Sequence, residues 1–177
     1  MVNHNVNHKT IEIINSLKGK EKIKILFVCL GNICRSPAAE EITRVIAKEM
    51  NLGNRVYLDS TGTYGGHRGQ LPDSRMRAHA IRRDYNLTHH SRPIKESDFD
   101  DFDIIVAMDD SNFNNLKHLA PTPEDESKIV RMADFMISHP YHDHIPDPYY
   151  EGAEGFELVL DLLEDSCRGL LNRIFKS

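Results

Sequence analysis

A cysteine, an arginine and a serine near the N-terminus have types and spacing that suit attack on a phosphate. The segment that holds them is Cys29-Leu30-Gly31-Asn32-Ile33-Cys34-Arg35-Ser36-Pro37. It directly follows an apolar run, residues 25–28, which is typical of a buried strand. Serine often caps a helix and proline suits its first position, so Ser36-Pro37 predicts a helix start. Cys29 is therefore expected at the tip of a strand, one short loop before a helix.

That loop has the composition of a phosphate cradle. Gly31 and Asn32 tolerate the backbone angles that let a loop curl until its N–H groups converge on an anion. The helix start adds positive potential, and Arg35 offers a planar fork for two phosphate oxygens. These surroundings favour the thiolate of Cys29, which can attack phosphorus, while the Ser36 hydroxyl can donate to the sulfur. A bare Cys-x5-Arg pattern would fit a buried structural cysteine, but this context favours a nucleophile.

The two other cysteines are Cys34 and Cys167. Cys34 has two interpretations: it packs in the interior, or it forms a reversible disulfide with Cys29 that shields the nucleophile from over-oxidation. Cys167 lies in a predicted helix and is expected to be structural. An odd count spread in this way does not fit a secreted disulfide framework. It favours a reducing compartment, so we expect a cytoplasmic protein.

A leaving phenolate or alkoxide needs a proton, and the candidate donor is Asp147. It lies in Ile145-Pro146-Asp147-Pro148-Tyr149-Tyr150, where two prolines stiffen the backbone. Tyr149 and Tyr150 can form the walls of a slot for a flat substrate. Taken alone, the segment fits an ordinary Pro-Asp-Pro turn better than an acid-bearing loop.

The order of the predicted elements indicates an α/β fold. Apolar runs predict strands at residues 23–29, 56–58, 102–108 and 129–132. Apolar spacing and end signals predict helices at residues 37–50, 73–85, 111–119 and 154–175. We therefore expect a three-layer sandwich with a central, mostly parallel four-stranded sheet and helices on both faces. The site should lie beyond the carboxyl ends of the strands, where Cys29, Ser60 and Asp109 are expected.

Length and composition indicate one domain. The chain has 177 residues and a net charge of -5, which gives no general reason to expect nucleic-acid or membrane binding. No segment is apolar enough over a sufficient length to span a bilayer. Residues 1–21 are polar and form an N-terminal extension, in which the spacing of Ile11, Ile14 and Leu17 favours either a short helix or a disordered lead. We expect a single domain at residues 22–177, and a monomer.

Together, the Cys29 loop and the Asp147-Pro148-Tyr149-Tyr150 motif resemble those of the low-molecular-weight protein tyrosine phosphatases. The resemblance extends from about residue 24 to residue 175. It implies a phosphotyrosine-containing protein as substrate and a two-step hydrolysis without metal or cofactor. Cys29 would form a phosphocysteine, and Asp147 would protonate the leaving oxygen and then activate water. Arg35 and the loop would hold the phosphate, with contributions from Leu30, Gly31, Asn32, Ile33, Cys34 and Ser36.

The resemblance also implies supporting residues. Ser60 and His89 would hold the side chain of Asn32, although His89 also fits an exposed polar turn. Arg92 and Asp109 would form an ion pair near the site. One position departs from the family, because Gly66 stands where a tryptophan or tyrosine usually forms one wall of the slot. Tyr64, two residues earlier, is the expected replacement, opposite Tyr149 and Tyr150.

Several alternatives stay open. Relatives that act on phosphoarginine tend to carry threonine at the position of Ile33, so its apolar side chain favours phosphotyrosine. Arsenate reductase chemistry on the same fold needs a relay of cysteines, for which Cys167 has no paired partner. A phosphopeptide-binding module with a dead site is a further alternative. A tyrosine kinase is a possible partner if it modifies Tyr149 or Tyr150. A zinc site is conceivable at a cluster of possible ligands whose spacing fits no standard site: His139, His142, Asp143 and His144.

Overall fold

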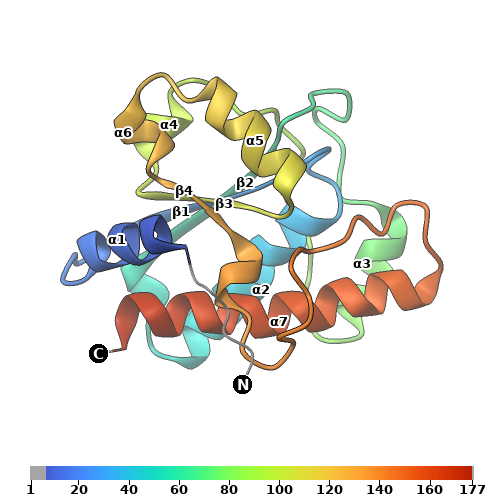
Figure 1. Cartoon of the computed structure of the whole chain (residues 1–177). Helices are drawn as coiled ribbons and strands as arrows, with labels where there is room; N and C mark the ends of the chain where they lie inside the picture. Colours follow the sequence, from blue (N-terminus) through green and yellow to red (C-terminus); the bar gives the residue numbers. More distant parts are fainter. Residues whose placement is uncertain (1–6, 177) are drawn as a thin grey trace.

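The structure is a computed structural model that describes residues 7–176. Its centre is a sheet of four strands in the order β2-β1-β3-β4 (Figure 1). The strands are β1 (Ile23–Cys29), β2 (Val56–Gly62), β3 (Ile104–Ala107) and β4 (Ile129–Arg131). Every pairing in this sheet is parallel, so the carboxyl ends of the strands share one edge. The expected α/β architecture is confirmed, and the sheet is wholly rather than mostly parallel.

Helices cover both faces of the sheet (Figure 1). They are α1 (His8–Leu17), α2 (Arg35–Glu49), α3 (Ser74–Ile81), α4 (Asp98–Asp101), α5 (Asp110–Leu119), α6 (Pro123–Glu126) and α7 (Ala153–Phe175). Short 3-10 turns follow α2 and β4, at Gly53–Arg55 and Met132–Phe135.

The two faces of β1 explain its continuous apolar sequence. Ile25 and Phe27 pack in the larger core with α2 and α7, whereas Leu26 and Val28 pack in a second core with α4 and α5. A central parallel strand is covered on both sides, so every position needs an apolar side chain. This arrangement brings Cys29 to the carboxyl edge with its side chain still buried.

Several boundaries differ from the sequence-based prediction; β3, for example, spans residues 104–107 instead of 102–108. Strand β2 runs to Gly62 because it pairs with β1 along its full length, so Ser60 lies inside the strand rather than after it. Helix α2 begins at Arg35 with Cys34 as its N-cap residue, so Ser36 is not the cap. Helix α3 ends at Ile81, four residues early, and Asp84 then adopts a left-handed backbone with φ 66°. The one-turn helices α4 and α6 are too short to show a periodic pattern and were not predicted.

Helix α1 packs the N-terminal extension onto the domain. Ile14 and Leu17 are buried, and the Thr10 hydroxyl donates to Asp134 at 2.9 Å. Residues 1–6 of the predicted extension lie outside the described part of the chain, and the domain boundary at residue 22 stays a prediction. No helix within residues 7–176 combines the length and the apolar character needed to cross a bilayer.

Candidate active site

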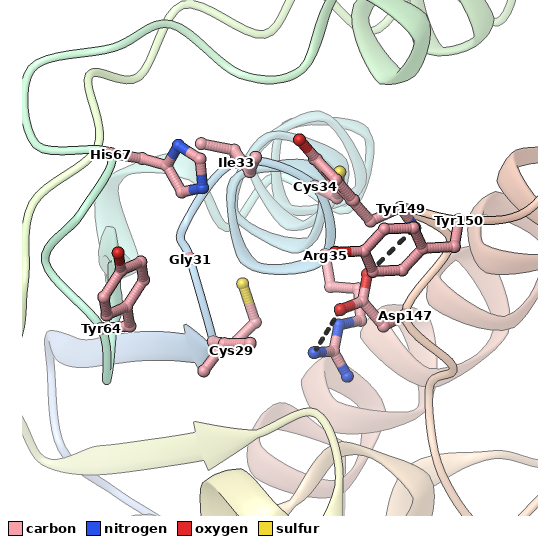
Figure 2. Close-up of a pocket in the computed structure, with 11 residues that line it drawn as sticks. Cys29, Gly31, Ile33, Cys34, Arg35, Tyr64, His67, Asp147, Tyr149 and Tyr150 are labelled. Atoms are coloured by element: carbon pink, nitrogen blue, oxygen red, sulfur yellow. Dashed lines mark hydrogen bonds and ion pairs between the residues drawn. The ribbon is translucent and has the colours of Figure 1, made fainter.

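A cavity of about 240 Å³ opens at the carboxyl edge of the sheet (Figure 2). It is lined by Cys29, Leu30, Gly31, Ile33, Cys34, Arg35, Tyr64, His67, Asp147, Tyr149 and Tyr150. Figure 2 shows Cys29 between Tyr64 on one side and Arg35 with Asp147 on the other. The structure thus brings the predicted nucleophile, phosphate ligand and acid together from segments more than 100 residues apart in the chain.

Asn32 holds the Cys29 loop in place from behind. Its backbone is left-handed, with φ 57°, and its side chain is buried. The amide nitrogen donates to Ser36 Oγ at 2.8 Å and to Ser60 Oγ at 3.1 Å. The amide oxygen accepts from the backbone N–H of Arg92 at 3.0 Å and lies 2.8 Å from His89 Nε2. The predicted grouping of Ser60 and His89 around Asn32 is therefore present.

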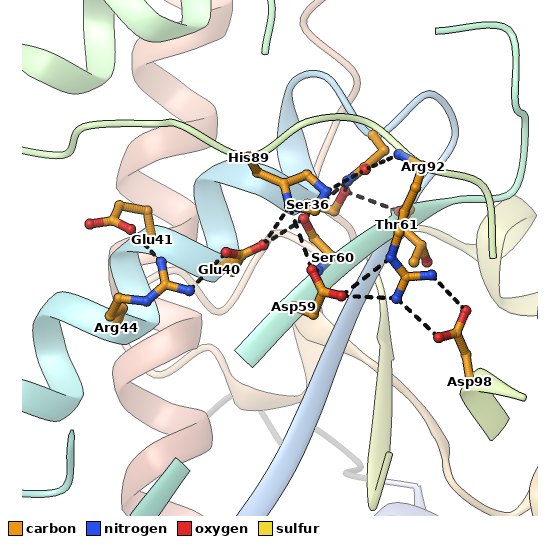
Figure 3. Close-up of polar contacts among 11 residues, drawn as sticks. Ser36, Glu40, Glu41, Arg44, Asp59, Ser60, Thr61, His89, Arg92 and Asp98 are labelled. Atoms are coloured by element: carbon orange, nitrogen blue, oxygen red, sulfur yellow. Dashed lines mark hydrogen bonds and ion pairs between the residues drawn. The ribbon is translucent and has the colours of Figure 1, made fainter. Parts of the chain in front are cut away.

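His89 links this loop to one buried and one half-buried carboxylate, those of Glu40 and Asp59 (Figure 3). Its Nδ1 lies 3.3 Å from Glu40 and 3.5 Å from Asp59, while its Nε2 faces the amide oxygen of Asn32. Both ring nitrogens therefore face acceptor oxygens. Glu40 also accepts from Ser60 Oγ at 2.8 Å. The loop is thus supported by one continuous hydrogen-bond network.

Cys29 lies at the floor of the cavity. Its sulfur is 3.0 Å from the Ser36 hydroxyl, which makes Ser36 a partner of the thiol instead of a helix cap. The backbone of Gly62 passes very close to that of Leu30, the residue after Cys29. A Cβ added at Gly62 would lie 2.5 Å from the Leu30 carbonyl oxygen. Only glycine fits at that position without moving the loop.

Arg35 is almost fully buried beside the thiol. Its Nη1 donates to Asp109 at 2.6 Å and to the Ile145 carbonyl at 3.0 Å. Its Nη2 lies 3.8 Å from Asp147. Burial opposes the charge, but Cys29, Asp109 and Asp147 hold the pKa of Arg35 above its usual value. The guanidinium is therefore a fixed positive charge that faces the cavity.

The expected pair between Arg92 and Asp109 is wrong. Asp109 caps α5 at the end of β3 and faces Arg35. Arg92 lies on the other side, next to the edge strand β2, and pairs with Asp59 at 2.9 Å and Asp98 at 3.0 Å (Figure 3). The two residues occupy opposite sides of the central strand β1, because β2 and β3 flank it.

Asp147 reaches over the cavity from the loop before α7. Its side chain is 43% exposed. One oxygen accepts from the backbone N–H of Tyr149 at 3.0 Å, and the other faces Arg35. A carboxyl group so placed can exchange protons with solvent and with a bound ester oxygen.

Aromatic rings flank the cavity on two sides. Tyr149 and Tyr150 meet edge to face at 4.9 Å, and Tyr64 meets His67 in the same way at 6.2 Å. The Tyr64 ring fills the space above Gly66, where an added Cβ would lie 2.2 Å from its ring atoms. Tyr64 thus occupies the place that a side chain at residue 66 would take.

His67 is a lining residue that sequence reasoning missed. A Cβ at Gly31 would lie 3.0 Å from the His67 ring, so the ring packs directly against the Cys29 loop. Its Nδ1 lies 3.0 Å from the Gln70 side chain, which fixes the ring orientation. His67 directly follows Gly66, the position at which the family usually has a tryptophan or tyrosine. That position was the signal in the sequence that His67 could line the cavity.

The three cysteines are free thiols. Burial first, and then the nearby carboxylate of Asp73, hold the pKa of Cys34 far above its usual value. Burial also raises the pKa of Cys167 to about 12, and its sulfur contacts the Ala39 carbonyl at 3.7 Å. Both are therefore poor nucleophiles in this conformation. A protective pairing of Cys34 with Cys29 stays a prediction.

The predicted histidine cluster is divided between separate partners. His139 bonds to Asp165 at 2.9 Å, and His144 bonds to its neighbour Asp143 at 2.6 Å. Within the described residues, three possible metal ligands converge elsewhere, at Glu40, Asp59 and His89. Arg44 and Arg92 pair with those two carboxylates, so a further cation would meet positive charge there.

Comparison with known proteins agrees with this geometry. Residues 24–177 match the family described as low molecular weight phosphotyrosine protein phosphatase. A low molecular weight protein-tyrosine-phosphatase from Streptomyces coelicolor is 40% identical over 150 residues, 84% of this chain and 91% of the relative. A crystal structure of a protein tyrosine phosphatase from Entamoeba histolytica, with Hepes in its active site, has a TM-score of 0.82 at 44% identity. That match covers 85% of this chain and 95% of the other.

A second solved structure carries a different name. The Drosophila arginine phosphatase superimposes with a TM-score of 0.81 at 35% identity, over 88% of this chain and 99% of the other. The family model covers far more than half of the sequence, and the curated relatives agree with it. This chain belongs to the low-molecular-weight phosphotyrosine protein phosphatase family.

Proposed function

We propose that the protein hydrolyses phosphotyrosine in proteins, and small aryl phosphates, through a phosphocysteine intermediate. The observation that carries the proposal is the convergence of Cys29, Arg35 and Asp147 on one cavity, with the thiol at its floor. These groups supply the nucleophile, the charge that binds phosphate and the acid that such a reaction needs.

In the first step the Cys29 thiolate attacks phosphorus while the bond to the tyrosyl oxygen breaks. Protonated Asp147 gives its proton to that oxygen, so tyrosine leaves as a neutral phenol. In the second step the Asp147 carboxylate takes a proton from water, whose oxygen attacks phosphorus and breaks the S–P bond. Phosphate and the thiolate result, and the Ser36 hydroxyl, 3.0 Å from the sulfur, stabilises the departing thiolate.

Arg35 and the loop N–H groups stabilise the charge on the equatorial oxygens in both steps. Nη1 is anchored by Asp109 and Ile145, so Nη2 and Nε are the positions that remain for phosphate oxygens. The cradle consists of residues 30–35, whose curled path depends on Asn32, Ser60 and His89.

Phosphotyrosine is the favoured substrate because the cavity is walled by apolar and aromatic groups. Ile33, Tyr64 and Tyr149 all line it. Phosphoarginine is the second candidate, since the arginine phosphatase from Drosophila is a structural relative. The Ile33→Thr variant should lower turnover of aryl phosphate relative to phosphoarginine. An unchanged ratio between the two substrates would remove Ile33 as the determinant.

The remaining proposals concern cellular context. A cytoplasmic, monomeric enzyme formed by residues 22–177 is consistent with free cysteines and a single sheet. Tyr150 is 93% exposed, which would give a tyrosine kinase access to it. Arsenate reduction is disfavoured because Cys167 is fully buried and bonded to Ala39.

The deciding experiment is hydrolysis of para-nitrophenyl phosphate at mildly acidic to neutral pH, with a chelator present. Wild type should be active, Cys29→Ser should be inactive, and Asp147→Ala should lose roughly 10²-fold or more in turnover. The Cys29→Ser protein should still bind a phosphotyrosine peptide. Activity that survives in Cys29→Ser, or loss of activity on chelation, contradicts the mechanism. A wild type that binds phosphotyrosine without turnover points to a binding module.

A further inference from the structure

Helix α3 carries apolar side chains on its outer surface as well as on its packed face. Leu71 is 43% exposed just before the helix, and Ile81 is 52% exposed at its last residue. With Ala78 and the buried Leu87 they line a shallow groove of about 490 Å³. Exposed apolar groups that form a continuous groove are a common feature of protein-interaction sites.

The outer surface and the packed face lie on opposite sides of α3. Met76 and Ala80 are buried on the inner side, which faces α7. At 3.6 residues per turn, Ala78 and Ile81 project to the opposite side. The same spacing places Arg77 and Arg82 on either border of this apolar stripe. Arg77 lines the groove, and Arg82 is exposed at the end of the helix.

The arginines of this region differ in their partners. Arg75 pairs with Asp73 at 2.9 Å, and Arg83 pairs with Asp161 at 2.9 Å. On the outer side, Arg77 donates to a backbone carbonyl, and neither it nor Arg82 forms an ion pair within residues 7–176. In a chain of net charge -5, these two unpaired cations create a local positive surface.

This groove adjoins the catalytic cavity. The backbone N–H of Asp73 donates to the carbonyl of Ile33 at 2.8 Å, and Ile33 lines the cavity. The next residue, Ser74, lines the groove. Helix α3 extends about 12 Å from there to Ile81. An extended peptide covers that length in about four residues.

We propose that this groove docks an acidic segment with apolar side chains, located roughly four to seven residues from the phosphotyrosine of a protein substrate. Its apolar side chains pack against Leu71 and Ile81, and its carboxylates pair with Arg77 and Arg82. The proposal rests on the proposed phosphatase function and deepens it, because it names a substrate feature that the catalytic cavity itself does not contact. Charge complementarity with the unpaired arginines identifies the occupant.

The test compares two phosphotyrosine peptides that differ in the flanking segment, one with glutamate and leucine and one with lysine and leucine. Each is made with the segment on the N-terminal and on the C-terminal side. Wild type should show kcat/KM about tenfold higher for the acidic peptide, a preference lost in roughly 0.5 M salt. The double variant Arg77→Glu, Arg82→Glu should reverse the preference. Ile81→Ser should lower kcat/KM for both peptides, because both carry leucine.

Two controls separate docking from damage to the fold or the active site. Every variant should hydrolyse para-nitrophenyl phosphate as wild type does, because that substrate does not reach α3. Arg173→Glu should leave the preference for the acidic peptide unchanged. Arg173 is an exposed arginine without an ion pair in the described chain, and it lies at the far end of α7. Thermal melting should show that each variant is folded.

Three results would overturn the proposal. The first is that the double variant retains the wild-type preference. The second is that the variants lower kcat/KM equally for every substrate. The third is that sedimentation shows self-association of wild type that Ile81→Ser prevents. If the protein proves inactive on all phosphates, the proposed function fails separately. Docking is then measured by fluorescence anisotropy with the unphosphorylated acidic peptide, where loss of binding in the double variant supports the groove and equal binding contradicts it.

Discussion

The nucleophile loop, residues 29–36, and the acid loop, residues 145–150, face the same cavity but are held very differently. The amide of Asn32 alone has four hydrogen-bond partners in the first loop. In the second, the carboxylate of Asp147 is 43% exposed, and its hydrogen bond within the described chain comes from Tyr149, two residues away. Rigid support is concentrated where phosphate binds and is sparse where the proton moves.

The difference follows from the two chemical tasks. A phosphate cradle stabilises the transition state through dipoles that are already aligned, so any loop disorder is costly. An acid that becomes a base within one turnover must exchange its proton and let a product leave, which requires contact with solvent. The comparison predicts that substitutions behind the nucleophile loop impair catalysis more than those that hold the acid loop.

Asn32→Ala is expected to have the largest effect. It removes all four hydrogen bonds of the amide and leaves His89 and Ser60 without that partner. Turnover of para-nitrophenyl phosphate should fall roughly 10²-fold, because the loop N–H groups lose their alignment. Unfolding by urea should show a loss of about 1–3 kcal/mol, as expected for buried polar groups left unsatisfied.

Asn32→Gly is the matched control for the left-handed backbone at this position, φ 57°. Glycine adopts that conformation freely, whereas alanine is strained there. If the side-chain network holds the loop, both variants should lose turnover to a similar extent. Near-normal turnover in Asn32→Gly would show that backbone strain alone explains the alanine result, and the proposed contrast between the two loops would fail.

Local sequence patterns were sufficient to predict the four strands, apart from the end of β2, and to place Cys29 and Arg35 in one loop. The apolar run before Cys29 predicts its strand because both faces of β1 are buried. Residues 59–62 were not predicted as strand, since buried polar Ser60 and Thr61 break the apolar pattern while the pairing with β1 continues. The spacing of Cys29 and Arg35 predicted that they share one loop. It did not predict that Asp109 would anchor the Arg35 guanidinium.

Contacts between distant segments account for what the sequence did not reveal. Nothing local indicates that the Tyr64 ring covers Gly66, or that His67 packs on Gly31. The same is true of Arg75, whose guanidinium lies 5.3 Å from the Tyr149 ring and 4.9 Å from the Phe156 ring. These contacts depend on how the segments pack in three dimensions, and single-chain spacing does not encode that packing.

Arg75→Met should have an intermediate effect, on the acid loop. Arg75 lies between Tyr149 and Phe156, so it holds the loop that carries Asp147 against α7. Methionine keeps much of the apolar stem but removes the cation. We expect about tenfold lower kcat with phenyl phosphate and a smaller loss with para-nitrophenyl phosphate, because the poorer leaving group depends more on the acid.

Two comparisons test whether Arg75 acts through the acid. In an Asp147→Ala background, Arg75→Met should cause little further loss, since the group that it positions is gone. Arg77→Met, on the outer side of α3, should leave both small substrates unaffected. Equal losses on the two leaving groups would assign Arg75 a purely structural role and would remove it from the comparison of the two loops.

Asp165→Asn should have the smallest effect on turnover and a distinct dependence on pH. Asp165 holds the start of the segment that leads to the acid loop, through bonds from the N–H groups of Ile137, Ser138 and His139 at 2.9–3.0 Å and from the His139 ring. Burial opposes its ionisation, but the hydrogen bonds hold the pKa of Asp165 below its usual value. A lowered pKa in the folded state stabilises the fold above the unfolded pKa of about 3.9, and this stabilisation is lost as pH falls through the folded value. Wild type should therefore melt at a higher temperature than Asp165→Asn at neutral pH, and this difference in melting temperature should disappear in acid. The control is Glu96→Gln, because Glu96 is an exposed carboxyl without an ion pair in the described chain. That variant should melt at the same temperature as wild type. A difference that persists at low pH would mean that the carboxylate charge does not anchor this end of the loop.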